Sequence, residues 1–483
     1  MDNMVTRWLE KLRENPPPWQ GVVVCVCGFV LELTLGAIFT FGNLTTYMTS
    51  YMRDRLDPTI NYAQLMWVSA SLSFFEGLTL SLGSWLTNRI GARWTAFIGC
   101  SLVTSGVSLC YFAVQHSVWL VALLFGVING LGVGIAYVVP LVCGMSWFPN
   151  SKGTSNGFIV GGFGLGALVF NSMQTAFLNP NNISPAEDGY FKDQQLLSQV
   201  PYVFLLTGGV YIVLQALAIA GMIKKPVPLK ESDDCQELGV ELQATADGMK
   251  PEDPSSDPGA ADQEPEEGSA ADYSSSMTIM QAVKTPTFWQ LFVTYLCNNL
   301  CIGFINPLWK TFGQQFIQDD RFLSAVGSAA SVFNLLGRVI WGFVNDRTNY
   351  RVAMLGVAGL LLTMFATLYL TIHGGKAMFL IWVCLVYMSF PGTFSIMPAE
   401  VAHVFGLQHA GEIYGLIWLS GGLVAPIPVF LTDLLLQRFG YLALFLTSAV
   451  FPTLSVICTL TFRGESTRRQ RLQPKAIKNG NSI

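Results

Sequence analysis

The sequence predicts an all-α membrane protein with twelve transmembrane helices in two six-helix halves. Three observations predict this fold: twelve long apolar stretches, a low content of charge, and a charged, proline-rich segment that divides the stretches six and six. Only 12% of the 483 residues are charged and 51% are apolar, with a mean hydropathy of +0.45. A soluble chain would carry about a quarter charged residues. About 20 apolar residues span a bilayer as a helix that satisfies its own backbone, and two such halves are typical of secondary transporters.

Each half contains six predicted spans. In the N-terminal half, residues 20–223, the apolar stretches cover 20–45, 64–87, 94–114, 117–142, 153–177 and 201–223. In the C-terminal half, residues 286–462, they cover 286–309, 323–345, 351–372, 377–400, 411–437 and 440–462. Residues 1–19 precede the first span, and the apolar run that follows them is too long for the core of a cleaved signal peptide. We therefore expect the first span to be retained.

The segment 224–285 is expected to be a disordered linker between the halves. Prolines, serines and acids dominate it, notably at 251–258, 264–267 and 274–276. Such a composition cannot bury enough apolar surface to fold. A solvated tether is the simplest interpretation, and its serines beside acids are candidates for phosphorylation. The tail at 463–483 is basic.

Basic residues indicate the orientation. Most of the 27 Lys and Arg residues fall on one side when both termini are placed in the cytoplasm, as the positive-inside rule requires. The linker and the tail are then cytoplasmic as well. The sequon Asn182-Ile183-Ser184 lies between spans 5 and 6 on the outer side, which makes Asn182 a glycosylation candidate. We expect a multi-pass protein of the plasma membrane.

The same short motif follows span 2 and span 8. One copy runs from Gly83 to Arg93 and the other from Gly342 to Arg347. Both resemble the loop motif of the major facilitator superfamily, Gly-x-x-x-Asp-Arg-x-Gly-Arg-Arg. Its acid can pair with arginine and sit near a helix N-terminus, so that it latches neighbouring helices. The latch candidates are Asn88, Arg89, Arg93, Asp346 and Arg347, although Asn88 stands where the motif has its acid and the second copy lacks the later glycine.

More specific segments resemble one branch of that superfamily. They are 130–137 with Pro140, Trp147-Phe148-Pro149, Lys152-Gly153, Phe288-Trp289, Lys310-x-Phe312-Gly313, Gly337-Arg338 and Tyr414-Gly415. Together they are similar to the oxalate:formate antiporter and monocarboxylate transporter branch. The resemblance implies alternating-access transport of small monocarboxylates such as lactate, pyruvate or formate, with the proton as a candidate co-substrate. It also implies a central cavity, open to one side, that spans 1, 4, 7 and 10 line, joined by spans 2, 5, 8 and 11, with spans 3, 6, 9 and 12 at the periphery.

Arg338 is the strongest candidate for binding substrate, because an ionisable side chain within a span is costly and defaults to a functional hypothesis. Asn334 and Trp341 share its helical face. A guanidinium offers the planar fork that a carboxylate binds, and it keeps its proton. The resemblance implies an arginine here that grips the substrate carboxylate. The alternative is a structural arginine that reaches toward the cytoplasm or pairs with Asp346.

Two acids fall near the middle of spans 1 and 2. A buried carboxyl group tends to hold its proton, so Glu32 and Glu76 are candidates for proton coupling. Alternatively, either acid pairs with Arg338 or hydrogen-bonds across helices. The resemblance leads us to expect a lysine near the outer end of span 1, where Asn43 stands, and a second basic residue in span 11, where residues 420–422 are Ser-Gly-Gly.

Polar side chains complete the predicted substrate site. Tyr295 and Asn299 follow helical spacing in span 7, and tyrosine and asparagine can hydrogen-bond a hydroxyl or keto group. Packing between helices is an equally good use for them. Tyr137 and Asn43 are further candidates. A single arginine suits a monocarboxylate better than a dianion. Two alternatives remain. The protein could transport another small polar metabolite, such as an amino acid or a dicarboxylate, or it could be a receptor that binds a ligand without transporting it.

Other function classes find little support. The chain has no basic stripe for nucleic acid, no spacing of metal ligands and no Ser/His/Asp constellation within a span, so we expect no cofactor, no metal and no enzyme activity. The glycines at 161–166 lie inside an apolar span and follow no strand, which argues against a dinucleotide loop. Most of the ten cysteines lie in the spans, where they pack as small hydrophobic residues. We expect the protein to lie in a lipid bilayer. Whether it binds an accessory membrane protein is a question that the sequence leaves open.

Overall fold

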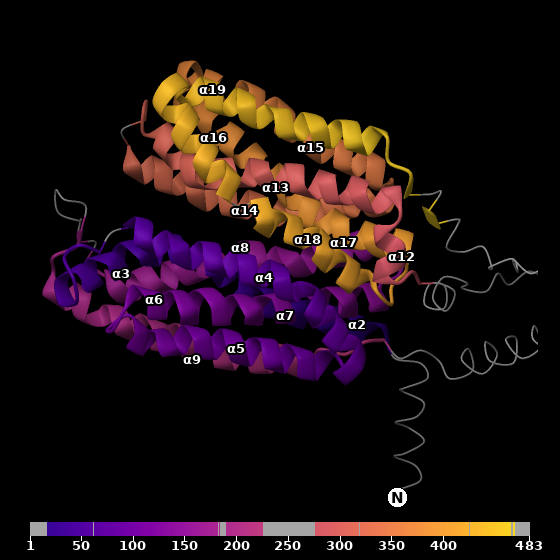
Figure 1. Cartoon of the computed structure of the whole chain (residues 1–483), viewed down its shortest axis with the longest axis horizontal. Coiled ribbons are helices and arrows are strands. Elements are labelled where there is room, and N and C mark those ends of the chain that lie inside the picture. The colour runs from indigo at the N-terminus through magenta and orange to yellow at the C-terminus, as the bar shows by residue number, and fades with distance from the viewer. Residues whose placement is uncertain are drawn as a thin grey trace, which may run out of the picture.

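The computed structural model describes residues 17–60, 62–181, 183, 190–225, 276–317, 319–424, 426–464 and 467–468. These residues form helices joined by turns (Figure 1). Asn182 and most of the linker, residues 226–275, lie outside the described residues, so glycosylation and linker disorder stay predictions. The N-terminal half contains α2 (Pro18–Leu35), η1 (Gly36–Thr40), α3 (Phe41–Arg55), α4 (Tyr62–Ile90), α5 (Ala92–Ala113), α6 (Val118–Val121), η2 (Ala122–Ile128), α7 (Asn129–Trp147), α8 (Lys152–Leu178) and α9 (Gln194–Ala220).

The C-terminal half begins with the short helix α12. Its helices are α12 (Ile279–Val283), α13 (Pro286–Gly313), α14 (Asp320–Arg347), α15 (Tyr350–Thr367), η4 (Leu368–Leu370), α16 (Thr371–Ser389), α17 (Pro391–Phe405), α18 (Ala410–Val424) and α19 (Pro426–Leu460). Two of them contain a break at a glycine with positive φ, Gly375 in α16 (φ 64°) and Gly440 in α19 (φ 73°). Glycine adopts this conformation without a steric penalty. Both breaks lie where the sequence predicts one span to end and the next to begin.

Nine stretches of the described chain are long and apolar enough to cross a membrane. One of them, Tyr350–Phe405, includes α15, α16 and α17, whereas α4 falls outside the nine. The number of twelve spans and the cytoplasmic side of the termini therefore stay predictions. The all-helical, membrane-spanning class that the composition predicts is the class that the structure has.

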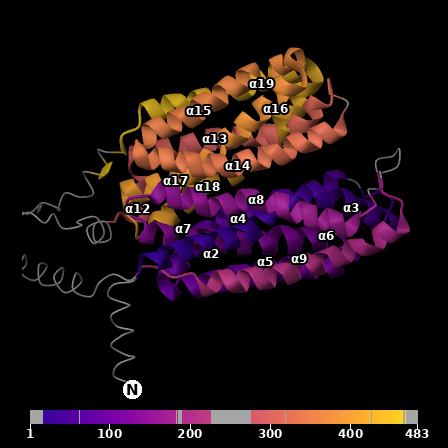
Figure 2. The same ribbon diagram turned by 180° about the vertical axis from the view of Figure 1, so that it is seen from behind.

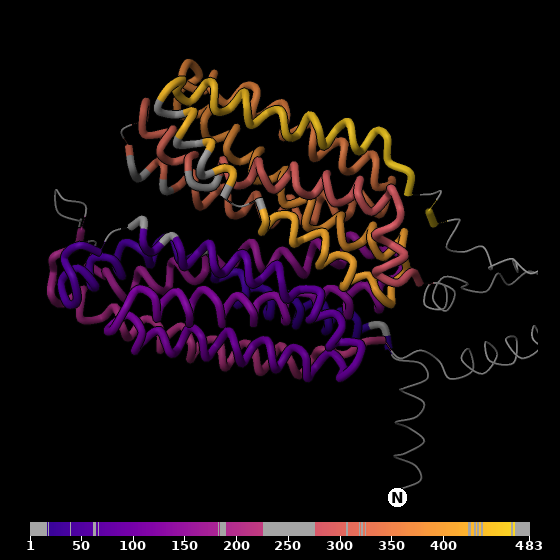
Figure 3. Tube along the Cα trace, in the orientation of Figure 1, coloured from indigo at the N-terminus to yellow at the C-terminus, as the bar shows by residue number. Residues whose placement is uncertain are grey.

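The helices of each half pack against one another, and the two groups meet along two lines (Figures 1 and 2). In the first contact, the α8–α14 seam, α14 lies along α8. In the second, the α4–α18 seam, α18 lies along α4. The C-terminal end of α9 and the short helix α12 lie at the same end of the bundle, which we call the linker end (Figure 3). The opposite end is the far end.

Glycine allows both seams to close. A Cβ atom on Gly157 of α8 would overlap the backbone carbonyl of Arg338, and one on Gly342 of α14 would overlap that of Gly153. In the other seam, Gly411 and Gly415 of α18 lie equally close to α4. Small residues at such positions let helix backbones touch, as is common between membrane helices.

Candidate functional site

A cavity of about 540 Å³ lies between the two halves. Its wall includes Ser73 and Glu76 of α4, Gly164 and Asn171 of α8, Tyr295, Asn299 and Trp309 of α13, Asn334 and Arg338 of α14, Phe394 of α17 and Trp418 of α18. Trp309 lies near the end of α13 and Gly327 near the start of α14, so the cavity extends from Arg338 toward the far end. Among the described residues, none of α5, α9 or α15 lines it, and neither does any residue of α7, contrary to the expected role of span 4.

Arg338 is buried at the inner end of this cavity, with only 3% of its surface exposed. Its Nε donates a hydrogen bond of 2.9 Å to Oδ1 of Asn334, one helical turn earlier, while Nη1 has no hydrogen-bond partner. The guanidinium carbon lies 5.2 Å from the ring centre of Phe394 and 6.0 Å from that of Phe163. Aromatic faces attract a cation. The side chain is thus positioned and desolvated, yet one nitrogen can still donate to a ligand.

Gly164 gives Arg338 and Asn334 their room. A Cβ atom at this position of α8 would lie 2.5 Å from Asn334 Oδ1 and 3.0 Å from Arg338 Nε. The third member of the predicted helical face, Trp341, turns away and donates from Nε1 to the carbonyl oxygen of Met388 at 3.1 Å. Asn334 and Arg338 therefore belong to the cavity, and Trp341 belongs to the packing of α14.

The two buried acids differ in their access to the cavity. Glu76 lines the cavity from α4, and its Oε1 has no partner. Glu32 on α2 is fully buried behind the wall, with neither carboxyl oxygen hydrogen-bonded. It interacts electrostatically with Arg338 but makes no ion pair with it. An ionised carboxylate without a partner costs several kcal/mol, so Glu32 is neutral unless the charge of Arg338 compensates it.

An aromatic floor closes the cavity toward the linker end. It consists of Tyr137, Tyr295, Phe394, Tyr414 and Trp418, with the ring of Trp418 at its centre: the other ring centres lie 4.9 Å (Tyr137), 5.8 Å (Tyr295), 5.4 Å (Phe394) and 5.8 Å (Tyr414) from it. The three tyrosine hydroxyls are buried without hydrogen-bond partners. Edge and offset contacts of this kind stabilise aromatic clusters. Water and ions therefore meet an apolar layer below Arg338.

The predicted site residues divide between the cavity and its surroundings. Tyr295 and Asn299 line the cavity, and Asn299 Nδ2 also donates to the carbonyl oxygen of Tyr295. Tyr137 lies under the wall as part of the floor. Asn43 does not line the cavity, because its Nδ2 donates to Thr175 Oγ1 at 3.1 Å and ties α3 to α8.

Sequence reasoning missed several residues of the wall. Asn171 on α8 faces the cavity with an unpartnered Oδ1, and Ser73 and Ser331 also lie on the wall. Asn171 carries a signal that points to it, a polar side chain in an apolar span. Gly164 carries none, since glycines recur along α8 and only the packing against α14 distinguishes it.

At the linker end of the α8–α14 seam, Asp346 contacts the start of α8. Its Oδ1 accepts from the Gly153 amide at 2.8 Å, and its Oδ2 accepts from both the amide and the hydroxyl of Thr154 at 2.6 Å. We call this contact the Asp346 latch. A carboxylate at a helix N-terminus satisfies unpaired amides and favours the helix dipole. Arg347 is directed elsewhere, with its guanidinium carbon 5.0 Å from the ring centre of Phe343.

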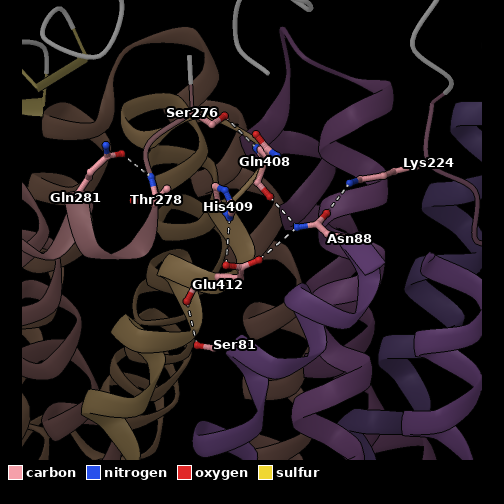
Figure 4. Close-up of polar contacts among 9 residues, drawn as sticks. All are labelled: Ser81, Asn88, Lys224, Ser276, Thr278, Gln281, Gln408, His409 and Glu412. Atoms are coloured by element: carbon pink, nitrogen blue, oxygen red, sulfur yellow. Dashed lines mark hydrogen bonds and ion pairs between the residues drawn. The ribbon is translucent and has the colours of Figure 1, made fainter. Parts of the chain in front are cut away.

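At the same end of the α4–α18 seam, Asn88 contacts the start of α18 (Figure 4). Its Nδ2 donates to the Gln408 carbonyl at 2.8 Å and to Glu412 Oε1 at 3.4 Å. Glu412 also contacts His409 Nδ1 at 3.2 Å. We call this contact the Asn88 latch. Arg89 and Arg93 bind elsewhere: Arg89 lies over the Trp85 ring, and Arg93 donates to the Ala220 carbonyl at 2.9 Å.

Known proteins resemble the chain over most of its length. The sequence profile of the Major Facilitator Superfamily matches residues 24–427 and again 291–483. The apicoplast pyruvate carrier 1 of Toxoplasma gondii is 28% identical over 464 residues, which cover 85% of this chain and 83% of the carrier. The oxalate:formate antiporter of Oxalobacter formigenes is 22% identical, with coverage of 76% and 75%, and human monocarboxylate transporter 14 is 23% identical, with 84% and 83%.

Solved structures show the same fold at low sequence identity. The proton:xylose symporter XylE superposes with a TM-score of 0.60 at 13% identity and covers 92% of this chain and 95% of the symporter. The transporter FucP in its outward conformation gives 0.59 at 13% identity, with coverage of 94% and 99%. The chain therefore belongs to the Major Facilitator Superfamily of membrane transporters, and its curated relatives include the pyruvate, oxalate:formate and monocarboxylate carriers of the branch that its motifs resemble.

Proposed function

We propose that this protein transports small monocarboxylates across a membrane by alternating access, with Arg338 as the residue that binds the carboxylate. The observation that carries the proposal is the Arg338 guanidinium, which is buried on the wall of a cavity between the halves with Nη1 unpartnered. An anion that enters the cavity completes the hydrogen bonding of this group. Relatives named for pyruvate, for oxalate and formate, and for monocarboxylates support the choice of substrate.

The charges on the cavity wall favour one carboxylate over two. Arg338 is the only lysine or arginine among the described residues that line the cavity, and Glu76 lines the same cavity. A dianion would leave one carboxylate without a cation in a poorly solvated space, at a cost of several kcal/mol. The dicarboxylate alternative is therefore the weaker one.

Proton coupling follows from the position of Glu32 near Arg338. Burial opposes the ionised form of Glu32, and in the empty carrier the charge of Arg338 gives that form its support. When the substrate carboxylate pairs with Arg338, that support is lost and Glu32 takes up a proton. We propose that Glu76, which lies on the cavity wall, transfers that proton between the cavity and Glu32. Anion binding and proton uptake are then linked one to one.

One observation favours a second candidate, transport of an amino acid. Arg338 and Glu76 line the same cavity from helices of different halves, so a zwitterion can place its carboxylate on one and its ammonium on the other. The variant Glu76→Gln separates the two candidates. A monocarboxylate transporter keeps its substrate affinity in this variant, whereas an amino-acid transporter loses it.

Uptake into proteoliposomes tests the proposal. We expect saturable uptake of radiolabelled lactate, pyruvate or formate that increases with an inward proton gradient. Absence of saturable uptake of these acids at every pH gradient would overturn the carboxylate assignment and leave the fold untouched. Binding without counterflow would instead identify a receptor. We place the protein in the plasma membrane, which a fluorescent fusion expressed in its own cell type tests.

A further inference from the structure

Both flanks of the segment that joins the halves end at the Asn88 latch (Figure 4). On one side, Lys224 Nζ donates to Asn88 Oδ1 at 3.1 Å. On the other, the Gln408 amide donates to Ser276 Oγ at 3.3 Å. Because Asn88 itself donates to the Gln408 carbonyl, these bonds form a continuous chain from Lys224 through Asn88 and Gln408 to Ser276. The chain joins the end of α9 to the segment before α12 and crosses the boundary between the halves.

The flanks are held in place by their own contacts. On the first flank, the Lys225 amide donates to Ser146 Oγ at 3.1 Å, and Trp147 Nε1 donates to the Ile223 carbonyl at 2.8 Å. On the second flank, the Met277 amide donates to the Phe405 carbonyl at 2.8 Å. Each flank is therefore bound to its own half next to the residue that reaches the latch. Lys224 and Ser276 are presented to the latch from fixed backbone positions.

The Asn88 latch needs such support because Asn88 is neutral. Asp346 makes three short bonds with a full negative charge, whereas Asn88 makes one bond of 2.8 Å and one of 3.4 Å to the opposite half. Hydrogen bonds to an ionised group are about twice as strong as neutral ones. The positive charge of the Lys224 ammonium at Oδ1 polarises the Asn88 amide, which strengthens the hydrogen bonds that Nδ2 donates to the opposite half.

We propose that Lys224 and Ser276 are positioning residues of the gate at the linker end, where the two linker flanks act as a strap that holds the α4–α18 seam closed. The strap sets how often this seam opens and so limits the conversion between the two access states. This inference rests on the alternating-access part of the proposed function and is independent of the substrate. Neither residue touches the cavity.

A cysteine introduced at a buried position in the α4–α18 seam would report how often the seam opens. Ser84 on α4 is 2% exposed and lies next to Gly411 of α18, so a thiol at Ser84→Cys reacts only when the seam opens. The reaction of the full-length protein in lipid nanodiscs with a water-soluble maleimide would be followed at this position by peptide mass spectrometry. Lys224→Met, which keeps most of the stem and removes the ammonium, and Ser276→Ala are the test variants.

We expect each test variant to increase the labelling rate about five-fold, the effect of one hydrogen bond of about 1 kcal/mol, and the pair to increase it further. Lys224→Arg should restore the parent rate. The matched control is Lys225→Met, which removes the same charge one residue later on an exposed side chain. Thermal unfolding of each variant verifies that the fold is retained.

Equal labelling rates in the parent, Lys224→Met and Ser276→Ala would overturn the strap, and so would an equal increase in Lys225→Met. The substrate proposal is judged separately. Faster labelling without uptake of any carboxylate would sustain the strap and reject the substrate. Uptake of carboxylates with unchanged labelling rates would support the substrate proposal and reject the strap.

Discussion

The α8–α14 seam and the α4–α18 seam are built alike and differ in charge. Each brings glycines of one helix against the other helix, each carries an ionisable residue that lines the cavity, and each ends in a latch at the linker end. The first seam has Arg338 and Asp346, whereas the second has Glu76 and Asn88 in the corresponding roles. The two seams thus share a geometry and place a basic residue on one side of the cavity and an acidic residue on the other.

The difference in charge between the two latches indicates that the two seams contribute differently to the conformational change. Asp346 binds two backbone amides and a hydroxyl at the start of α8, so the α8–α14 seam is tied by a full charge on the same helix as Arg338. The α4–α18 seam is tied by amide bonds and depends on the linker flanks. We expect the second seam to open first and the first to act as the pivot.

The largest expected effect is at Arg338. Removing the guanidinium leaves a substrate anion without its partner in a poorly solvated cavity, at a cost of roughly 3–5 kcal/mol, which exceeds two decades in affinity. Arg338→Lys should be impaired as well as Arg338→Gln, because an ammonium lacks the planar fork. Substrate affinity of purified, folded variants is the measurement, with the exposed Lys376→Gln as the control. Unchanged affinity in both variants would remove Arg338 from the site.

The next largest effect is at the Asp346 latch. Asp346→Ala removes three bonds to an ionised acceptor, each worth about 1.5–3 kcal/mol, so protection of the Gly153 and Thr154 amides should fall by at least roughly ten-fold. Hydrogen exchange at these two amides measures the effect directly. Arg347→Gln is the control, since Arg347 lies over the Phe343 ring. If exchange at Gly153 and Thr154 stayed at the parent rate, the α8–α14 seam would be held by its glycine packing alone.

Variants of Glu32 and Glu76 should show which acid couples proton uptake to transport and which only transfers the proton. Glutamine mimics a protonated carboxyl group, so Glu32→Gln should transport at a rate that no longer increases as the pH falls, while Glu76→Gln should keep the pH dependence at a lower rate. Initial uptake rates between pH 5 and pH 8 in proteoliposomes measure both. The reverse assignment, with pH dependence lost in Glu76→Gln and kept in Glu32→Gln, would make Glu76 the coupling acid.

The smallest effect is a few-fold change at the Asn88 latch. Asn88→Asp introduces the acid of the family motif, yet it places a second carboxylate against Glu412 and removes the amide that donates to Gln408. We expect labelling of Ser84→Cys to increase a few-fold, and Glu412→Gln added to Asn88→Asp to reverse most of that increase. A decrease in labelling by Asn88→Asp alone would show that Lys224 outweighs Glu412 at this latch.

The sequence predicts the helical fold and draws attention to Arg338, which the structure places on the cavity wall, for a physical reason. Charge is so unfavourable in a membrane span that Arg338 stands out in its apolar run, and the two motif copies mark the latches. Periodicity identifies a helix face but not the helix that covers it, so Asn43 and Tyr137 could not be excluded from the cavity. The partners of Asn88 also escaped prediction, because Glu412 lies 324 residues away and only the packing of α4 on α18 brings it close.

The proximity of Glu32 to Arg338 has an electrical consequence. In the proposed cycle, the empty site holds one guanidinium and one carboxylate, and the loaded site holds the guanidinium, the substrate anion and a protonated Glu32. Both forms have zero net charge. Moving one elementary charge through the bilayer is worth about 2.3 kcal/mol per 100 mV, and the proposed cycle moves none when Glu76 carries the same charge in both forms. Under this proposal, membrane potential neither drives nor opposes turnover, and the concentrations of acid and proton alone set the direction.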